Sequence, residues 1–205
     1  MSRNPADLPA VSRSFSRGFD AIRAQPGLVL LATVAVVPAA SLLFLGTRSE
    51  GTVRIWLQVA AVVVGSAASL PLGRAALAVV DGHRLSMAEA FRTGGSFATA
   101  VGTGLLFTLV LTAGLYLLLL PGIWVVLTYG FAWLSVADGA WRPLEALSRA
   151  GRIATGNRWT LCVFLLGAVA VVAAGAVLLG IGALVGFSIV AVGAADLYRA
   201  LGGGR

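Results

Sequence analysis

The residues best suited to chemistry lie in one basic segment, WRPLEALSRAGRIATGNRW, at positions 141–159. An arginine guanidinium group stays charged in proteins and presents a planar set of donors that fits phosphate and carboxylate groups. The segment therefore predicts a binding surface for an anionic lipid headgroup or for an acidic partner, formed by Arg142, Arg149, Arg152, Asn157 and Arg158.

The side chains that catalysis or metal binding requires are scattered along the sequence. The chain has one histidine, His83, and one cysteine, Cys162, which cannot form an intrachain disulfide. Metal sites need several His, Cys, Asp or Glu side chains together. None of the eight acidic residues falls at the middle of an apolar run, which argues against a proton-coupled pump. We therefore expect no enzymatic activity, no cofactor and no metal.

The composition indicates an all-α integral membrane protein. The 205 residues are 59% hydrophobic and 11% charged, whereas soluble domains are about 45–50% apolar and about 25% charged. Too few polar residues remain to coat a core in water. All fifteen basic residues are arginines, and they fall between apolar runs. This placement favours topology signals beside anionic lipid over a nucleic-acid partner.

The apolar runs predict six transmembrane helices, because about 20 apolar residues suffice for one crossing. Residues 1–26 precede them, and residues 202–205 form a flexible tail. The expected spans are 27–46, 55–80, 97–120, 122–138, 159–179 and 182–201.

Proline and glycine residues mark the expected breaks. Pro121 and Gly122 predict a tight turn between the third and fourth spans, and the LLGIG stretch, at Gly180 and Gly182, separates the fifth from the sixth. Pro71 is expected to kink or shorten the second span. Gly182 and Gly186 have the Gly-x-x-x-Gly spacing that favours close helix packing.

The arginines predict the orientation. With the N-terminus inside, thirteen of the fifteen arginines fall in cytoplasmic segments, and only Arg48 and Arg54 fall outside. Positive charge accumulates on the cytoplasmic side of membrane proteins. We therefore expect both termini in the cytoplasm. The absence of lysine and the abundance of Ala, Gly and Val are typical of a GC-rich bacterial genome, which places the protein in a bacterial inner membrane.

The N-terminal segment, residues 1–26, predicts an amphipathic interfacial helix. Its apolar residues recur every three or four positions, and arginines interleave with them. Pro26 closes the segment. The expected apolar stripe consists of Leu8, Val11, Phe15, Phe19 and Ile22.

Two cytoplasmic loops resemble each other: VVDGHRLSMAEAFRTGG at 79–95 and VADGAWRPLEALSRAGR at 136–152. Both contain Asp-Gly, an arginine, Glu-Ala and a second arginine in that order. The similarity indicates either an internal repeat or two loops that meet the same need for an interfacial helix. Arg84 and Arg92 of the first loop are further candidates for headgroup or partner binding.

Each loop carries helix-start signals. Ser86 and Glu89 have capping-box spacing, and Pro143 suits the first position of a helix. Trp141 and Trp159 flank the second loop and are expected to anchor it at headgroup depth.

The stretch LLLLPGIWVVLTYGFAW, with the ADG and RPLEALSRAGRIATGNRW that follow it, resembles a group of poorly characterised bacterial integral membrane proteins. This group is related to the membrane domain of glycerophosphodiester phosphodiesterases. The resemblance implies six helices and a non-catalytic membrane module. The matching positions are Pro121, Gly122, Tyr129, Asp138, Glu145, Ala146, Gly156 and Asn157.

These observations predict a non-enzymatic protein that acts as a lipid-contacting scaffold or as a subunit of a membrane assembly. Its expected partners are anionic membrane lipids, further copies of the chain or other membrane subunits. A transporter or lipid-handling protein is the alternative, with an inner-leaflet cavity that the four arginines of 141–159 would line. A membrane enzyme would need a catalytic set that the sequence does not display.

Overall fold

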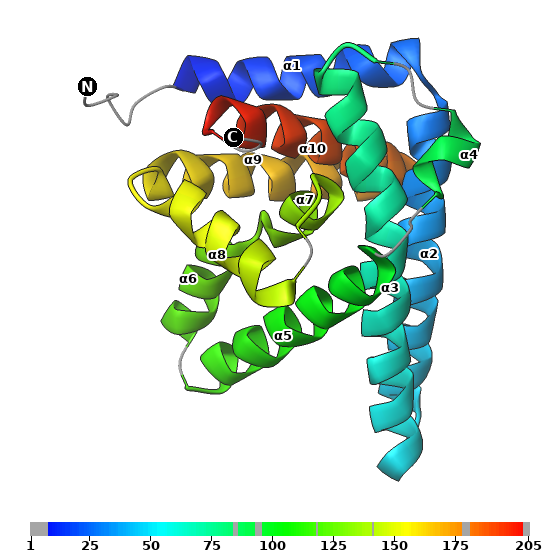
Figure 1. Ribbon diagram of the computed structural model, residues 1–205. Coiled ribbons are helices and arrows are strands. Elements are labelled where there is room, and N and C mark those ends of the chain that lie inside the picture. Colours follow the sequence, from blue (N-terminus) through cyan, green and yellow to red (C-terminus); the bar gives the residue numbers. More distant parts are fainter. Residues whose placement is uncertain are drawn as a thin grey trace.

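The computed structural model describes residues 8–83, 86–92, 96–117, 119–140, 142–177 and 181–202. All regular elements within these ranges are helices, which confirms the all-α prediction for this part of the chain (Figure 1). The elements are α1 (Leu8–Ala24), α2 (Gly27–Arg48), α3 (Gly51–Val80), α4 (Met87–Ala90), α5 (Ser96–Leu117), α6 (Leu119–Tyr129), α7 (Ala132–Ala137), α8 (Pro143–Ala154), α9 (Arg158–Val177) and α10 (Ile181–Ala200).

Five stretches of the described chain are long and apolar enough to cross a membrane. They lie in α2, α3, α5, α9 and α10, and about 20 residues of helix reach across a hydrocarbon layer of about 30 Å. Large apolar side chains on their outer surfaces are exposed, among them Trp56 at 71% and Leu109 at 69%. Lipid is the solvent that such a surface requires, so the protein is membrane-embedded.

The segment predicted as the fourth span is shorter and broken. The apolar stretch Pro121–Ala137 divides into α6 and α7, with Gly130 and Phe131 between them. A Cβ atom on Gly130 would lie 2.5 Å from the carbonyl oxygen of Val126, so the break requires glycine. Seventeen residues of continuous helix would reach about 26 Å, which is less than the hydrocarbon layer of about 30 Å.

The predicted break between the third and fourth spans lies a few residues earlier than expected. Pro121 and Gly122 do not form the turn, because α5 ends at Leu117 and both residues lie in the first turn of α6. Proline is tolerated there, because an N–H group in the first turn of a helix has no acceptor within the helix, so its absence costs no hydrogen bond. Gly122 instead packs on α5: a Cβ atom on Gly114 would lie 3.2 Å from the Gly122 nitrogen.

Helix α3 also runs through Pro71 and ends only at Val80, so the second span is not shortened there. Pro71 is fully buried, and Gly73 lets α7 approach closely. A Cβ atom on Gly73 would lie 2.9 Å from the Cβ of Ala137 and 3.0 Å from the ring of Trp133. Packing against α7 thus holds the helix together where proline removes one hydrogen bond.

Of the two glycines predicted to separate the fifth span from the sixth, Gly180 lies outside the described residues, and Gly182 lies within α10 and faces α9. A Cβ atom on Gly182 would lie 2.3 Å from the carbonyl oxygen of Gly175, and one on Gly186 would lie 3.0 Å from that of Val171. The two backbones therefore touch along this line.

The core collects where α1, α9 and α10 meet the ends of α3 and α7. Phe15 of α1 stacks on Phe164 of α9 with ring centroids 5.1 Å apart. Phe131 continues the aromatic contacts from Phe164, at 6.4 Å, to Tyr198 of α10, at 6.3 Å. By contrast, α2 and α3 form a hairpin whose far end extends beyond the other helices (Figure 1).

The helix predicted in the N-terminal segment is present as α1, and small residues form much of its packed face. Val11, Ser14, Gly18 and Ala21 are buried, whereas Phe19, predicted on the apolar stripe, is 48% exposed. Helix α1 lies beside α10 (Figure 1). Its small residues allow this close approach.

Replacing Gly18 by alanine is expected to detach α1 from α10. The added Cβ would lie 2.4 Å from the backbone carbonyl oxygen of Ile189, which cannot move as a side chain can. Overpacking of this kind costs about 1–3 kcal/mol. Limited trypsin digestion in detergent should cleave α1 faster than in the wild type. Ser16→Ala is the control, because the Ser16 hydroxyl donates to a carbonyl of its own helix. If trypsin cleaves the Gly18→Ala variant no faster than the wild type, α1 does not pack on α10 through Gly18.

Candidate functional site

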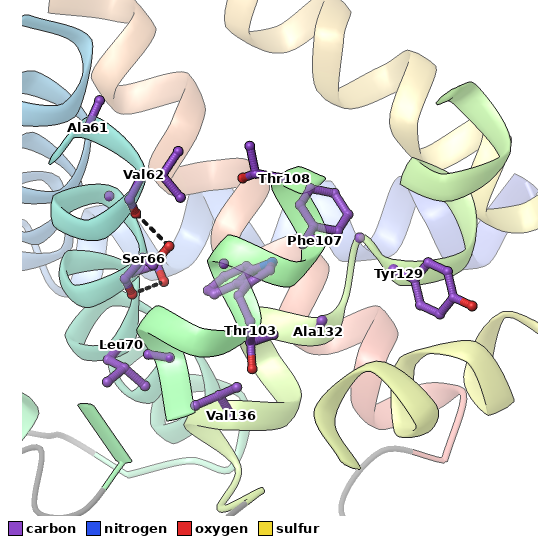
Figure 2. A pocket seen from close by; sticks show the side chains of 16 residues that line it. Ala61, Val62, Ser66, Leu70, Thr103, Phe107, Thr108, Tyr129, Ala132 and Val136 are labelled. Atoms are coloured by element: carbon purple, nitrogen blue, oxygen red, sulfur yellow. Dashed lines mark hydrogen bonds between the residues drawn. The ribbon is translucent and has the colours of Figure 1, made fainter. Parts of the chain in front are cut away.

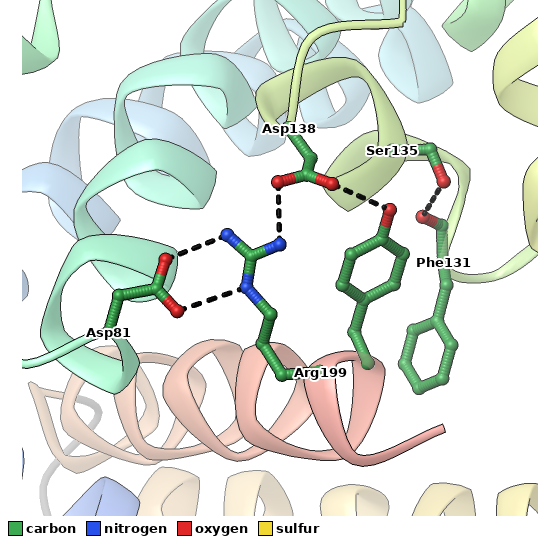
Figure 3. Close-up of polar contacts among 6 residues, drawn as sticks. Asp81, Phe131, Ser135, Asp138 and Arg199 are labelled. Carbon is green, nitrogen blue, oxygen red and sulfur yellow. Dashed lines mark hydrogen bonds and ion pairs between the residues drawn. The ribbon is translucent and has the colours of Figure 1, made fainter. Parts of the chain in front are cut away.

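Arg199 joins the ends of three helices. From the last turn of α10, its Nε and Nη2 atoms donate to the two carboxylate oxygens of Asp81 at 3.1 and 2.7 Å. Its Nη1 atom donates to Asp138 at 2.7 Å. The hydroxyl of Tyr198, which is fully buried, donates to the other oxygen of Asp138 at 3.3 Å. Figure 3 shows the guanidinium group between the two carboxylates.

The two aspartates occupy equivalent positions in the two similar loops. Each is followed by a glycine with positive φ, +80° at Gly82 and +101° at Gly139. Both turns have the same backbone bonds, as in a Schellman motif. In the first turn, the amides of Asp81, Gly82 and His83 donate to the carbonyls of Leu77, Val79 and Ala78, respectively. In the second turn, the amides of Asp138, Gly139 and Ala140 donate to the carbonyls of Leu134, Val136 and Ser135.

The similarity ends after the turns. The first loop continues into the four-residue helix α4, whereas the second continues into the twelve-residue helix α8. The predicted capping box is present in α4: the Ser86 amide donates to Glu89, and the Glu89 amide donates to the Ser86 hydroxyl. The bonds that the Glu89 carboxylate accepts lower its pKa: the Ser86 amide donates the one with the larger effect, and the Ser86 hydroxyl donates the other at 2.7 Å. The repeated geometry is therefore the Asp-Gly helix end.

Asp196 makes the corresponding connection for α1. It is 7% exposed and accepts a hydrogen bond of 2.7 Å from the Ser14 hydroxyl, while Arg17 forms an ion pair with it. A buried carboxylate needs such partners to remain charged. Asp196 thus binds α1 to the bundle.

Helix α8 presents a basic face and a buried face. Ala146, Ala150 and Ile153 are buried, whereas Arg142 and Arg152 are exposed. Leu144 is 71% exposed although its side chain is apolar. The buried face is formed by small residues because α8 packs closely on α5, α6 and α7.

The arginines of α8 differ in their partners. Arg149 forms an ion pair with Glu145 at 2.9 Å, four positions earlier. Arg152 bonds the Ser148 hydroxyl at 3.0 Å. Within the described residues, neither Arg142 nor Arg152 forms an ion pair with an acidic side chain. Their charges are available to an external anion.

The other predicted residues of this segment lie just beyond α8. The Asn157 side chain donates to the Ile153 carbonyl at 3.0 Å and so provides a partner for a carbonyl in the last turn of α8. Arg158 lies over the ring of Trp124, 5.0 Å from its centroid, and Trp159 is 65% exposed. Arg92 of the first loop is exposed. The predictions for Arg84 and Trp141 fall outside the described residues.

A cavity of about 290 Å³ lies between α3, α5 and the α6–α7 segment. Five residues that carry a hydroxyl group line it together with Trp133; they are Ser66, Ser69, Thr103, Thr108 and Tyr129. Figure 2 shows Ser66 on one helix, with Thr103 and Thr108 on another. The lining contains no charged side chain.

The arginines of 141–159 do not line the cavity between α3, α5 and the α6–α7 segment. Two more cavities among the described residues are lined almost wholly by apolar side chains, and none of the three includes an arginine. The described part of the chain also has no group of three His, Cys, Asp or Glu residues that could hold a metal ion.

Sequence reasoning identified the acidic residues at the span ends but missed their common partner, Arg199. The repeated Asp-Gly pair indicated two similar helix ends but not the arginine that the two aspartates share. The hydroxyl-lined cavity had no signal, because single Ser and Thr residues in apolar helices usually bond their own backbone.

The chain matches no protein-family model, no curated protein and no solved structure in the comparisons made with each. The resemblance to the membrane domain of glycerophosphodiester phosphodiesterases therefore depends on the motif residues alone.

Proposed function

We propose that the protein is a non-enzymatic, lipid-contacting scaffold or assembly subunit of the bacterial inner membrane. It crosses the membrane six times, and both termini lie in the cytoplasm. The exposed basic face of α8 docks on anionic lipid headgroups or on an acidic partner subunit. That basic face carries the proposal.

The meeting of helix ends supports the topology. In a six-span arrangement with the N-terminus inside, α3, α7 and α10 all end on the cytoplasmic side. The C-terminal residues of these helices converge on one cluster, where Arg199 holds Asp81 and Asp138. The α6–α7 segment is then the fourth crossing.

The charge on α8 supports lipid contact. Arg142 and Arg152 are exposed on the helix that the topology assigns to the cytoplasmic surface, and within the described residues neither has an acidic partner. The inner leaflet is rich in anionic headgroups, and each arginine near it contributes about 1 kcal/mol. The family resemblance also implies a membrane module without catalysis.

Changing Arg142 and Arg152 together to glutamine is expected to weaken binding of phosphatidylglycerol about thirtyfold, because two charges contribute about 2 kcal/mol. Native mass spectrometry of the purified protein, titrated with phosphatidylglycerol and with phosphatidylcholine, measures the affinities. The matched control is Arg48→Gln with Arg54→Gln. It removes two exposed arginines near the connection between α2 and α3, at the end of α3 opposite to Asp81.

Equal loss in the two double variants, or equal affinity for both lipids in the wild type, would contradict lipid docking through α8. Release of a co-purified subunit only from the Arg142/Arg152 variant would instead identify α8 as a protein-docking surface, which is the assembly-subunit form of the proposal.

A further inference from the structure

We propose that the cavity between α3, α5 and the α6–α7 segment binds a neutral two-chain glycerolipid with a free hydroxyl group, such as diacylglycerol. The hydroxyl group would occupy the polar cavity, and the acyl chains would enter the two apolar cavities beside it. This site is separate from the basic face of α8, so either proposal can fail alone.

An unpartnered buried hydroxyl indicates a ligand. Thr103 lines the cavity and is 3% exposed, and its hydroxyl has no hydrogen-bond partner among the described residues. Threonine hydroxyls in apolar helices ordinarily bond a backbone carbonyl of the preceding turn, as Thr128 does with Trp124. A buried hydroxyl without a partner costs about 1–3 kcal/mol, which a ligand oxygen would recover.

The neighbouring serines supply acceptors. The Ser66 hydroxyl donates to the Val62 carbonyl at 2.6 Å, and the Ser69 hydroxyl donates to the Ser66 carbonyl at 2.8 Å (Figure 2). Their hydrogens are used, but their lone pairs remain available. A headgroup with ester oxygens and a free hydroxyl both accepts and donates, so one of its oxygens can accept the hydrogen of Thr103 and its hydroxyl can donate to a serine oxygen.

The absence of charge in the lining determines the class of ligand. An ionised headgroup in this cavity would lose its water without gaining a counter-charge, which is strongly unfavourable. A phosphate-bearing lipid is therefore excluded from the cavity. It can contact the protein at the exposed arginines of α8.

Two apolar cavities adjoin the polar one and share its residues. One, of about 290 Å³, lies between the α6–α7 segment, α9 and α10, and shares Phe107, Gly130 and Trp133 with the polar cavity. The other, of about 390 Å³, lies along α2 and shares Gly65, Ser69 and Trp133. A hydroxyl-lined space with two adjoining apolar spaces matches a small headgroup with two chains.

Dimensions agree with a partly enclosed lipid. At about 30 Å³ per water-sized group, the polar cavity holds about ten such groups, enough for a glycerol headgroup and its ester links. The chains are longer than the apolar cavities, and their remaining carbons would lie in the surrounding bilayer.

Thr103→Val tests the site, because valine keeps the shape of threonine and removes its hydroxyl. We expect the affinity for dioleoylglycerol to fall about threefold to tenfold, the effect of one hydrogen bond. Native mass spectrometry of the full chain in detergent, with dioleoylglycerol added, gives the affinities. Thr128→Val is the matched control: Thr128 is buried to a similar degree but does not line the cavity. Thr103→Ser should retain binding.

Stability provides a second readout. Since the Thr103 hydroxyl is buried without a partner, Thr103→Val should leave the melting temperature of ligand-free protein unchanged or raise it. A variant that binds less dioleoylglycerol while melting no lower than the wild type has lost a ligand contact and not its fold.

Two results would overturn the proposal. One is equal wild-type affinity for dioleoylglycerol and triolein, which has no free hydroxyl. The other is an equal change of affinity in Thr103→Val and Thr128→Val. The Arg142/Arg152 variant should bind dioleoylglycerol like the wild type, whatever its effect on phosphatidylglycerol.

Discussion

Replacing Arg199 by methionine is expected to lower the free energy of unfolding by about 3 kcal/mol, the lower end of the cost of breaking a buried ion pair. Methionine keeps the apolar length of the side chain but leaves Asp138, whose side chain is 11% exposed, without a counter-charge. The ends of α3 and α7 would also lose their common link to α10. Unfolding in increasing sodium dodecyl sulfate, followed by circular dichroism, measures the change.

Two further variants separate charge from geometry. Arg158→Gln removes an exposed arginine that lies over Trp124 and should change stability little. Arg199→Lys keeps the charge but lacks the forked donors that reach both carboxylates, so its stability should lie between wild type and Arg199→Met. If Arg199→Met unfolds like the wild type, the cluster does not join the helix ends.

Replacing Gly175 by alanine is expected to destabilise the protein by about 3 kcal/mol, the upper end of the cost of overpacking. The new Cβ would lie 2.2 Å from the backbone oxygen of Gly182. Because the obstacle is backbone, no side-chain rotation relieves the contact, and α9 and α10 must move apart. The same detergent unfolding experiment measures the loss.

Gly151→Ala is the matched control for this substitution. A Cβ atom on Gly151 would lie 3.6 Å from the ring of Tyr129, an ordinary contact. Alanine also favours a helix over glycine by about 1 kcal/mol, so this variant should equal or exceed wild-type stability. Equal stability of the two variants would show that Gly175 and Gly182 do not touch.

Local features of the chain were predictable because they depend on neighbouring residues. The mutual bonds of Ser86 and Glu89 follow from a spacing of three residues, and Pro143 begins α8 because its ring suits a helix start. The long apolar runs likewise gave five helices of membrane-crossing length.

The errors arose where packing overrides a local signal. Pro71 suggests a helix break, but contact of Gly73 with α7 supports a continuous α3. Pro121 and Gly122 suggest a turn, but a proline in the first turn of a helix costs nothing there, and Gly122 is used to approach Gly114. Both residue types serve turns and close helix contacts alike, so sequence alone does not separate the two uses.

By itself, the sequence determined that this chain is helical and membrane-embedded, and it located the basic residues and the repeated Asp-Gly pairs. Each of these follows from composition or from short-range spacing. Only the tertiary structure brought Arg199 to Asp81 and Asp138, which are 118 and 61 positions away along the chain. It alone also assembled hydroxyls from separate helices around one cavity. Side-chain periodicity tells which residues share a face of one helix, whereas the partner of that face depends on how all the helices pack together.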